Sequence, residues 1–278
     1  MKKSQNIDLN TVESFGDEWG RFDQTGMSEE EAKKIFEGYF SIFEWDNLPD
    51  NPIGFDMGCG SGRWAKWVAP KVSKLHCIDP SNALEIAKKN LNAYDNIHYH
   101  KASVDSVELE DSSQDFGYSL GVLHHIPNTA EAIQSCSKLL KPKAPMLLYL
   151  YYAFDNRNFI FKLIWQTSNF LRRLIHPLPS GLKHFVTDVI ATLIYWPLAK
   201  FSKVLSKIGV SSKNIPLSFY QHHSFYTMRT DARDRFGTPL EQRFSKDQIY
   251  SMMENAGFEK IKFCNHEPYW CVIGYKKQ

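Results

Sequence analysis

Paired cysteines, an excess of one charge and long apolar runs are all missing from this sequence. Its 33 basic and 31 acidic residues leave a net charge of +2, so composition gives no general case for a nucleic-acid partner. The five cysteines form no C-x-x-C pair, which predicts free thiols in a reducing, cytoplasmic compartment. The first ten residues lack the apolar segment of a secretory signal.

Membrane-spanning and metal-binding patterns are missing as well. In the most apolar region, residues 155–208, the longest stretch without a charge is 189–199, which is eleven residues. A helix that crosses a bilayer needs roughly 20. The ten histidines show neither H-E-x-x-H nor Cys/His ligand spacing, so we predict no metal site.

Short apolar segments alternate with amphipathic ones in the first half of the chain. Strands are predicted at 52–58, 74–81, 96–104, 115–126 and 144–154, with helices at 63–72, 82–94 and 129–142 between them. The pattern resumes with a helix at 245–258 and two strands at 259–266 and 269–277. We therefore predict an α/β, Rossmann-like, doubly wound sheet of seven strands, mostly parallel, with a closing antiparallel hairpin.

Residues 155–208 interrupt this alternation. Apolar residues recur there at helical spacing, which predicts two helices, the second bent or ended near Pro197. The region holds eight basic residues against two acidic ones. We predict a helical insertion after the fifth strand.

The stretch FDMGCGSGRWA, residues 55–65, places three glycines in five positions between a strand and a helix. Glycines allow a tight turn and a close approach of ligand to backbone. The spacing differs from the dinucleotide pattern G-x-G-x-x-G, and an aspartate precedes it. The stretch resembles motif I of the class I S-adenosylmethionine-dependent methyltransferases. The later stretches CIDPS, GVLHHIPN and MENAGF resemble other parts of the family's pattern, and the whole resembles the branch that O-methylates small molecules and sugars.

The resemblance implies that S-adenosylmethionine is the cofactor. Asp79, 21 residues after Gly58, would hold the ribose hydroxyls, and the usual adenine-binding acid is replaced by Ser103. Aromatic residues near the N-terminus would form a lid. The implied cofactor-binding residues are Trp19, Asp56, Gly58, Cys59, Gly60, Gly62, Arg63, Asp79, Pro80, Ser103, Val104 and Leu120.

An alcohol acceptor must lose a proton, and histidine has a suitable pKa for a general base. His124 and His125 follow the fourth strand and Asp155 follows the fifth, a trio that resembles the catalytic group of sugar O-methyltransferases. We predict either histidine as the base and Asp155 as its partner. The predicted acceptor-binding residues are Tyr152, Arg157, His222, His223, Tyr226, Arg229 and Arg243.

The sequence predicts three regions: an N-terminal lid at 1–50, a methyltransferase core at 51–154 and 240–278, and a helical insertion over the acceptor at 155–239. The leading hypothesis is O-methylation of a sugar or glycan precursor. N- or S-methylation of a metabolite stays open, as does action at a membrane surface on a lipid-linked or quinone substrate through residues 155–208. Methylation of nucleic acid is disfavoured, because GVLHHIPN stands where such enzymes carry [DNS]-P-P-[YFW]. The oligomeric state is left open.

Overall fold

The computed structural model describes residues 6–155, 159–212 and 215–278. The chain divides into two compact units. The sheet unit comprises Met1–Gly20, Ala32–Asp155 and Leu240–Gln278, and the helical unit comprises Arg21–Glu31 and Asn156–Pro239. Residues 21–31, which the sequence analysis assigned to the N-terminal lid, thus belong to the helical unit.

The sheet unit contains seven strands in the order β3-β2-β1-β4-β5-β7-β6. Strands β1 to β5 are parallel, whereas β7 runs antiparallel to both β5 and β6. The predicted fold class is therefore confirmed. The strands are β1 (Ile53–Met57), β2 (Lys74–Ile78), β3 (Ile97–His100), β4 (Phe116–Leu120), β5 (Pro145–Tyr149), β6 (Phe258–Phe263) and β7 (Cys271–Lys276).

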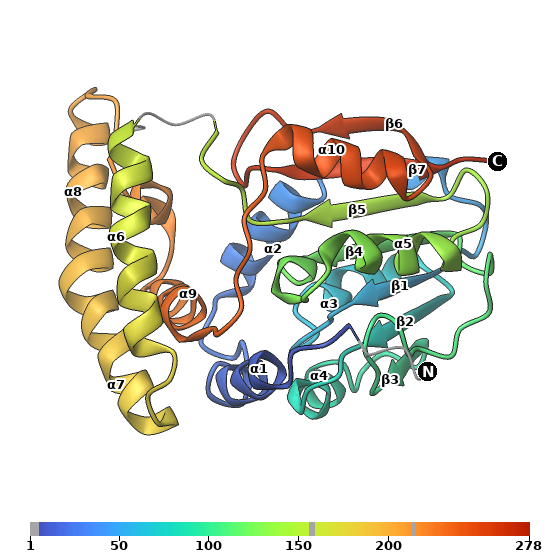
Figure 1. Ribbon diagram of the computed structural model, residues 1–278, viewed down its shortest axis with the longest axis horizontal. Coiled ribbons are helices and arrows are strands. Elements are labelled where there is room, and N and C mark those ends of the chain that lie inside the picture. Colours follow the sequence, from blue (N-terminus) through green and yellow to red (C-terminus); the bar gives the residue numbers. More distant parts are fainter. Residues whose placement is uncertain (1–5, 156–158, 213–214) are drawn as a thin grey trace. The chain divides into compact units, whose positions relative to one another are not determined.

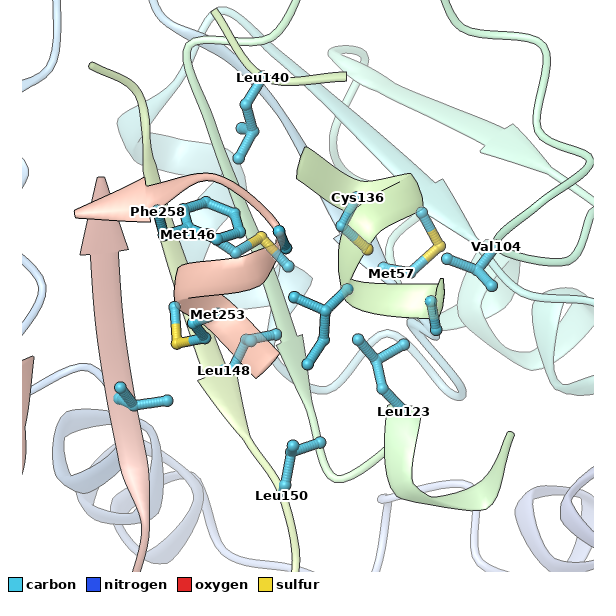
Figure 2. Packing of buried hydrophobic residues seen from close by; sticks show 14 of the residues in the cluster. Met57, Val104, Leu123, Cys136, Leu140, Met146, Leu148, Leu150, Met253 and Phe258 are labelled. Atoms are coloured by element: carbon cyan, nitrogen blue, oxygen red, sulfur yellow. The ribbon is translucent and has the colours of Figure 1, made fainter. Parts of the chain in front are cut away.

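Helices cover both faces of this sheet (Figure 1). Helices α5 (Thr129–Leu139) and α10 (Lys246–Asn255) pack on one face, where Figure 2 shows Leu148 of β5 and Met253 of α10 in the same apolar cluster. On the other face, Leu147 packs with α2 (Glu29–Tyr39), α3 (Ala65–Val68) and α4 (Ala83–Asn90). Successive residues of β5 thus point to opposite faces, which explains its continuous apolar sequence.

Strand order reverses between β1 and β4, because β2 and β3 lie to one side of β1 and the later strands lie to the other. In open parallel sheets, ligands bind at such a point, beyond the carboxyl ends of the strands. The glycine turn follows β1 and the histidine pair follows β4, so the topology brings both predicted motifs to this edge.

The helical unit is built from α6 (Phe159–Ile175), α7 (Ser180–Ile190), α8 (Trp196–Lys207) and α9 (Phe225–Gly237). A π-helical turn, Ala191–Tyr195, joins α7 to α8 just before Pro197. Proline provides no N–H for the preceding turn, which accounts for the irregularity there. Helix α9 was not predicted, because its sequence is dominated by polar residues. Among the described residues, none of the helices combines the length and hydropathy needed to cross a bilayer.

Candidate functional site

The glycine turn requires backbone conformations that other residues rarely adopt. Gly58, Gly60 and Gly62 have φ angles of +80°, +53° and +77°. A Cβ atom at Gly58 would lie 2.3 Å from Val122, and one at Gly62 would lie 2.6 Å from Leu91. Glycine is therefore required at these positions by both conformation and space. The turn is held to β2, because the N–H groups of Gly58 and Cys59 donate to the carbonyl of Ile78.

Asp79 connects the end of β2 to this turn. Its Oδ2 accepts a hydrogen bond of 2.9 Å from the Gly60 N–H, and its Oδ1 accepts bonds from the N–H and hydroxyl of Ser81. The carboxylate, followed by Pro80, thus lies beside the glycine turn as a ribose ligand must. Its role as that ligand stays a prediction.

Asp56 ends β1 as a buried carboxyl group, 1% exposed. Burial raises its pKa to about 8, and the nearby charge of Asp79 contributes to the increase. The group is therefore largely protonated at neutral pH. A cationic ligand bound at the glycine turn would favour its ionised form.

Helix α1 (Leu9–Arg21) places aromatic side chains against the same turn. The Trp19 Nε1 atom lies 3.1 Å from the position that a Cβ at Gly60 would take. The Arg63 guanidinium lies over Trp19 and Trp64, at 5.1 Å and 4.3 Å from their ring centres. This contact supports the predicted N-terminal lid. The predicted helix at 63–72 is shorter than expected, because only Ala65–Val68 is α-helical before Pro70.

The turn after β3 contains a carboxylate that the sequence analysis overlooked. The Ser103 hydroxyl donates to Asp105 Oδ1 at 2.6 Å, and Asp105 Oδ2 accepts from the Asn6 N–H. Val104 packs into the core beneath, and Leu120 ends β4. Since Asp105 lies two residues after Ser103, its side chain was available in the sequence as an alternative acidic group for this loop.

The histidine pair lies in a short 3₁₀ turn, Leu123–His125, rather than in the strand that the sequence predicted. His124 is fully buried, with its ring 3.9 Å from that of Tyr151 and 4.0 Å from that of His125, between centroids. Its ring nitrogens have no hydrogen-bond partner within the described ranges. Burial, with the neighbouring His125 and Arg243, holds the pKa of His124 well below its usual value. The His124 ring is therefore expected to be neutral and to accept a proton poorly.

His125 is oriented by the backbone. Its Nδ1 lies 2.6 Å from the carbonyl oxygen of Leu240. Because a carbonyl only accepts, this contact assigns the proton to Nδ1 and makes Nε2 the basic nitrogen of the neutral ring. The ring of Phe15 on α1 packs edge-on against His125, with 4.9 Å between centroids.

Tyr151, which was not predicted as a site residue, lies against both histidines, and the acceptor-binding role of Tyr152 stays a prediction. The Arg243 guanidinium lies 5.0 Å above the Tyr151 ring. Tyr152 instead packs with Phe154, Tyr269 and Trp270. Alternation along an extended chain places neighbouring side chains on opposite sides. Applied to LLYLYY, residues 147–152, the same rule groups Tyr151 with Tyr149 and separates Tyr152.

Arg243 was predicted at this edge, and its position depends on Glu241. The Arg243 Nε donates to Glu241 Oε1 at 2.8 Å, and the Glu241 side chain is 1% exposed. The segment is held beside the histidines because the Gln242 N–H donates to the carbonyl of His124. The sequence analysis passed over Glu241 and also Glu18, a carboxylate 1% exposed on α1.

Asp155 makes contacts that favour a structural role. Its Oδ1 accepts from the Trp270 indole N–H, and its Oδ2 accepts from the Lys246 N–H at the first turn of α10. Both bonds are 3.0 Å long. These bonds tie Asp155 to Trp270 and to the start of α10, and its pairing with a catalytic histidine stays a prediction.

The other predicted acceptor ligands belong to the helical unit. Arg229 donates two hydrogen bonds of 2.9 Å to Asp188, which also pairs with Arg21. The Tyr226 hydroxyl accepts from the Gln24 N–H, and His223 contacts the carbonyl of Phe219. Each contact lies within that unit, and roles for these residues and His222 in binding an acceptor stay predictions. Arg157 lies outside the described residues.

A cavity of about 260 Å³ opens elsewhere in the sheet unit. None of its lining residues was predicted as a site residue, and none belongs to the groups described above. They are Lys33, Phe36, Glu37, Phe40, Trp45, Trp67 and Lys71.

Comparisons with known proteins found a matching family and several relatives. Residues 55–148 match the family described as "Methyltransferase domain". A relative named "Ubiquinone biosynthesis O-methyltransferase", from Hahella chejuensis (strain KCTC 2396), is 28% identical over 174 residues, covering 59% of this chain and 70% of the relative.

Solved structures are similar in fold at low identity. The CurJ carbon methyltransferase has a TM-score of 0.54 at 13% identity, covering 98% of this chain and 62% of that chain. Human N-acetylserotonin methyltransferase in complex with SAM has a TM-score of 0.51 at 13% identity, covering 87% and 52%. At such identities, these similarities show the fold alone.

Proposed function

Because this chain is a class I S-adenosylmethionine-dependent methyltransferase, we propose that it methylates a hydroxyl oxygen on a small aromatic molecule of the quinone-forming kind. The relatives support this acceptor over the sugar preferred from the sequence, since they carry the name of ubiquinone biosynthesis and none of those reported names a sugar. The quinone alternative raised from the sequence is thus the better supported one.

The residues present fit S-adenosylmethionine, which supplies an activated methyl group on a sulfonium. The glycine turn exposes backbone where a side chain would obstruct a ligand. Asp79 adds a carboxylate beside the turn, and Asp56 adds an ionisable group beneath it. Trp19 is available to exclude water from above the turn.

His125 is the residue best placed to take the acceptor proton, and its contact with Leu240 is the observation that carries this assignment. The carbonyl of Leu240 keeps Nδ1 protonated, so Nε2 is the basic nitrogen of the neutral ring and the atom that would take the hydroxyl proton. The resulting imidazolium keeps its Nδ1–H bond to the carbonyl. A phenol, with a pKa of about 10, needs far less help from a base than an alcohol.

The aromatic groups around His125 favour a flat acceptor. The imidazole of His125 contacts the rings of Phe15, His124 and Tyr151. Arg243 above Tyr151 adds a cation to this apolar surface. Aromatic rings prefer offset or edge-on packing against other rings, which suits an aromatic acceptor better than a polyhydroxylated sugar.

An acceptor screen tests the proposal. Purified protein with S-adenosylmethionine would be offered catechol, a hexose, an aliphatic amine and an aliphatic thiol, with S-adenosylhomocysteine release as the readout. Turnover of catechol with a methoxy product is expected. Turnover of the hexose, amine or thiol in preference to catechol would overturn the aromatic acceptor while leaving the cofactor assignment intact.

A further inference from the structure

Helices α6, α7 and α8 of the helical unit bury several polar side chains and expose many apolar ones. On α6, Arg172 is 6% exposed and donates to the carbonyls of Thr238 and Pro239, whereas Phe159 and Phe170 are 75% and 61% exposed. A helix of a water-soluble domain normally shows the opposite pattern, with its apolar stripe buried. Helix α6 is amphipathic, but it presents its apolar face outward.

The same inversion continues along α7, the π-helical turn and α8. Lys183, Thr187 and Ser202 are buried on this segment. The exposed apolar side chains recur at helical spacing and form a single stripe. They are Leu182, Phe185, Val189, Leu193, Trp196, Phe201, Val204 and Ile208.

The exposed apolar side chains are not those that form the core of the helical unit. Helix α9 packs against α6 and α7, and the apolar core of the unit contains Ile175, Tyr195 and Phe236. The exposed residues are additional to this core. Single exposed apolar residues are common, whereas many exposed apolar side chains gathered on a few helices mark sites for membranes or partners.

The charges around the stripe are of one sign. Lys162, Arg173, Lys200 and Lys207 are exposed on α6 and α8. The acidic residue of these helices, Asp188, is already paired with Arg21 and Arg229. Apolar side chains flanked by exposed cations match an anionic lipid surface, where the apolar side chains enter the acyl boundary and the cations meet headgroups.

We propose that the outward faces of α6, α7 and α8 bind the surface of an anionic bilayer. The protein lies on the membrane without crossing it, since the described helices are too short and too polar to span. This proposal does not depend on the acceptor, because lipid binding is measured without methyl transfer. It also explains why apolar residues that would otherwise cost solubility occupy the exposed positions.

Vesicle sedimentation of the full chain tests this surface. At low salt, the protein is expected to sediment with vesicles of phosphatidylcholine containing 30% phosphatidylglycerol, several-fold less with phosphatidylcholine alone, and less again in 0.5 M NaCl. Phe185→Ser with Leu193→Ser should reduce partitioning at least tenfold. Leu9→Ser with Tyr250→Ser, also exposed but in the sheet unit, should leave partitioning unchanged.

A charge pair provides a second measurement in case the apolar variant fails to fold. Lys162→Glu with Lys200→Glu should weaken binding to anionic vesicles several-fold, whereas Lys89→Glu with Lys138→Glu makes the same change in net charge on the sheet unit and should not. The proposal would be overturned if the protein did not sediment with anionic vesicles at low salt. It would also be overturned if either variant and its matched control lost vesicle binding equally. A dimer, detected by light scattering, that Phe185→Ser with Leu193→Ser dissociates while vesicles bind nothing would overturn it as well.

Discussion

The Nδ1 atom of His125 lies 2.6 Å from the carbonyl oxygen of Leu240, a residue 115 positions away in the sequence. The contact joins the 3₁₀ turn after β4 to the segment that precedes α10. It assigns the tautomer of His125 and separates its role from that of His124, whose buried ring is kept neutral. Two adjacent histidines thereby acquire different chemistry.

The first prediction follows from this contact. His125→Ala should lower the single-turnover rate with a phenolic acceptor by about 10²-fold, the low end of general-base effects, because the proton acceptor is lost but a phenol needs less help from a base. Affinity for S-adenosylhomocysteine should change little. His98→Ala, at an exposed position on β3, is the control. A near-normal rate in folded, cofactor-saturated His125→Ala would remove His125 from the reaction.

The second prediction concerns the pH dependence of stability. The folded-state pKa of Asp56, about 8, lies above its ordinary value of 3.8. The folded chain therefore holds this proton more tightly, and the free energy of unfolding should fall as pH rises between those values. Asp56→Asn should remove this part of the decline, as measured by urea unfolding at pH 5 and pH 8. Parallel curves for wild type and variant would contradict the assignment. The exposed Asp46→Asn should have no effect on the slope.

The third prediction concerns the carboxylate beside the glycine turn. Asp79→Ala should weaken S-adenosylhomocysteine binding by roughly 1.5–3 kcal/mol, since it removes hydrogen bonds to a charged group and frees the Gly60 N–H. Titration calorimetry measures the change directly. Asp95→Ala, an exposed aspartate before β3, should bind normally. Equal affinities in the two variants would reject Asp79 as a cofactor ligand.

The fourth prediction compares two neighbouring tyrosines. Tyr151→Leu should raise KM for an aromatic acceptor by up to about tenfold, because it removes a ring from the wall beside the histidines. Tyr152→Leu should instead lower Tm with KM unchanged, because that ring packs with Tyr269 and Trp270. The reverse pattern would mean that the acceptor lies on the other side of β5.

Local sequence patterns were sufficient for the architecture. Alternation of apolar strands and amphipathic helices predicted the seven strands and the hairpin. The helical and strand repeats of side-chain direction arise from backbone geometry within a few residues, so they can be found in the sequence. The glycine turn was equally readable, since all three glycines have positive φ angles and Gly58 and Gly62 also lack space for a Cβ atom. The cofactor could therefore be inferred from residues 55–65 and their order relative to later motifs.

The functional details depended on contacts between residues far apart in the chain. Asp155 appeared to be a partner for a histidine because it follows the neighbouring strand, yet Trp270 and the start of α10 occupy both its oxygens. Glu241 gained importance only when folding placed Arg243 over Tyr151. Periodicity in 155–208 identified apolar stripes but not which way they face. For α6 and α7, packing on α9 decided that, because Arg172 and Lys183 are buried while the apolar side chains of these two helices face solvent.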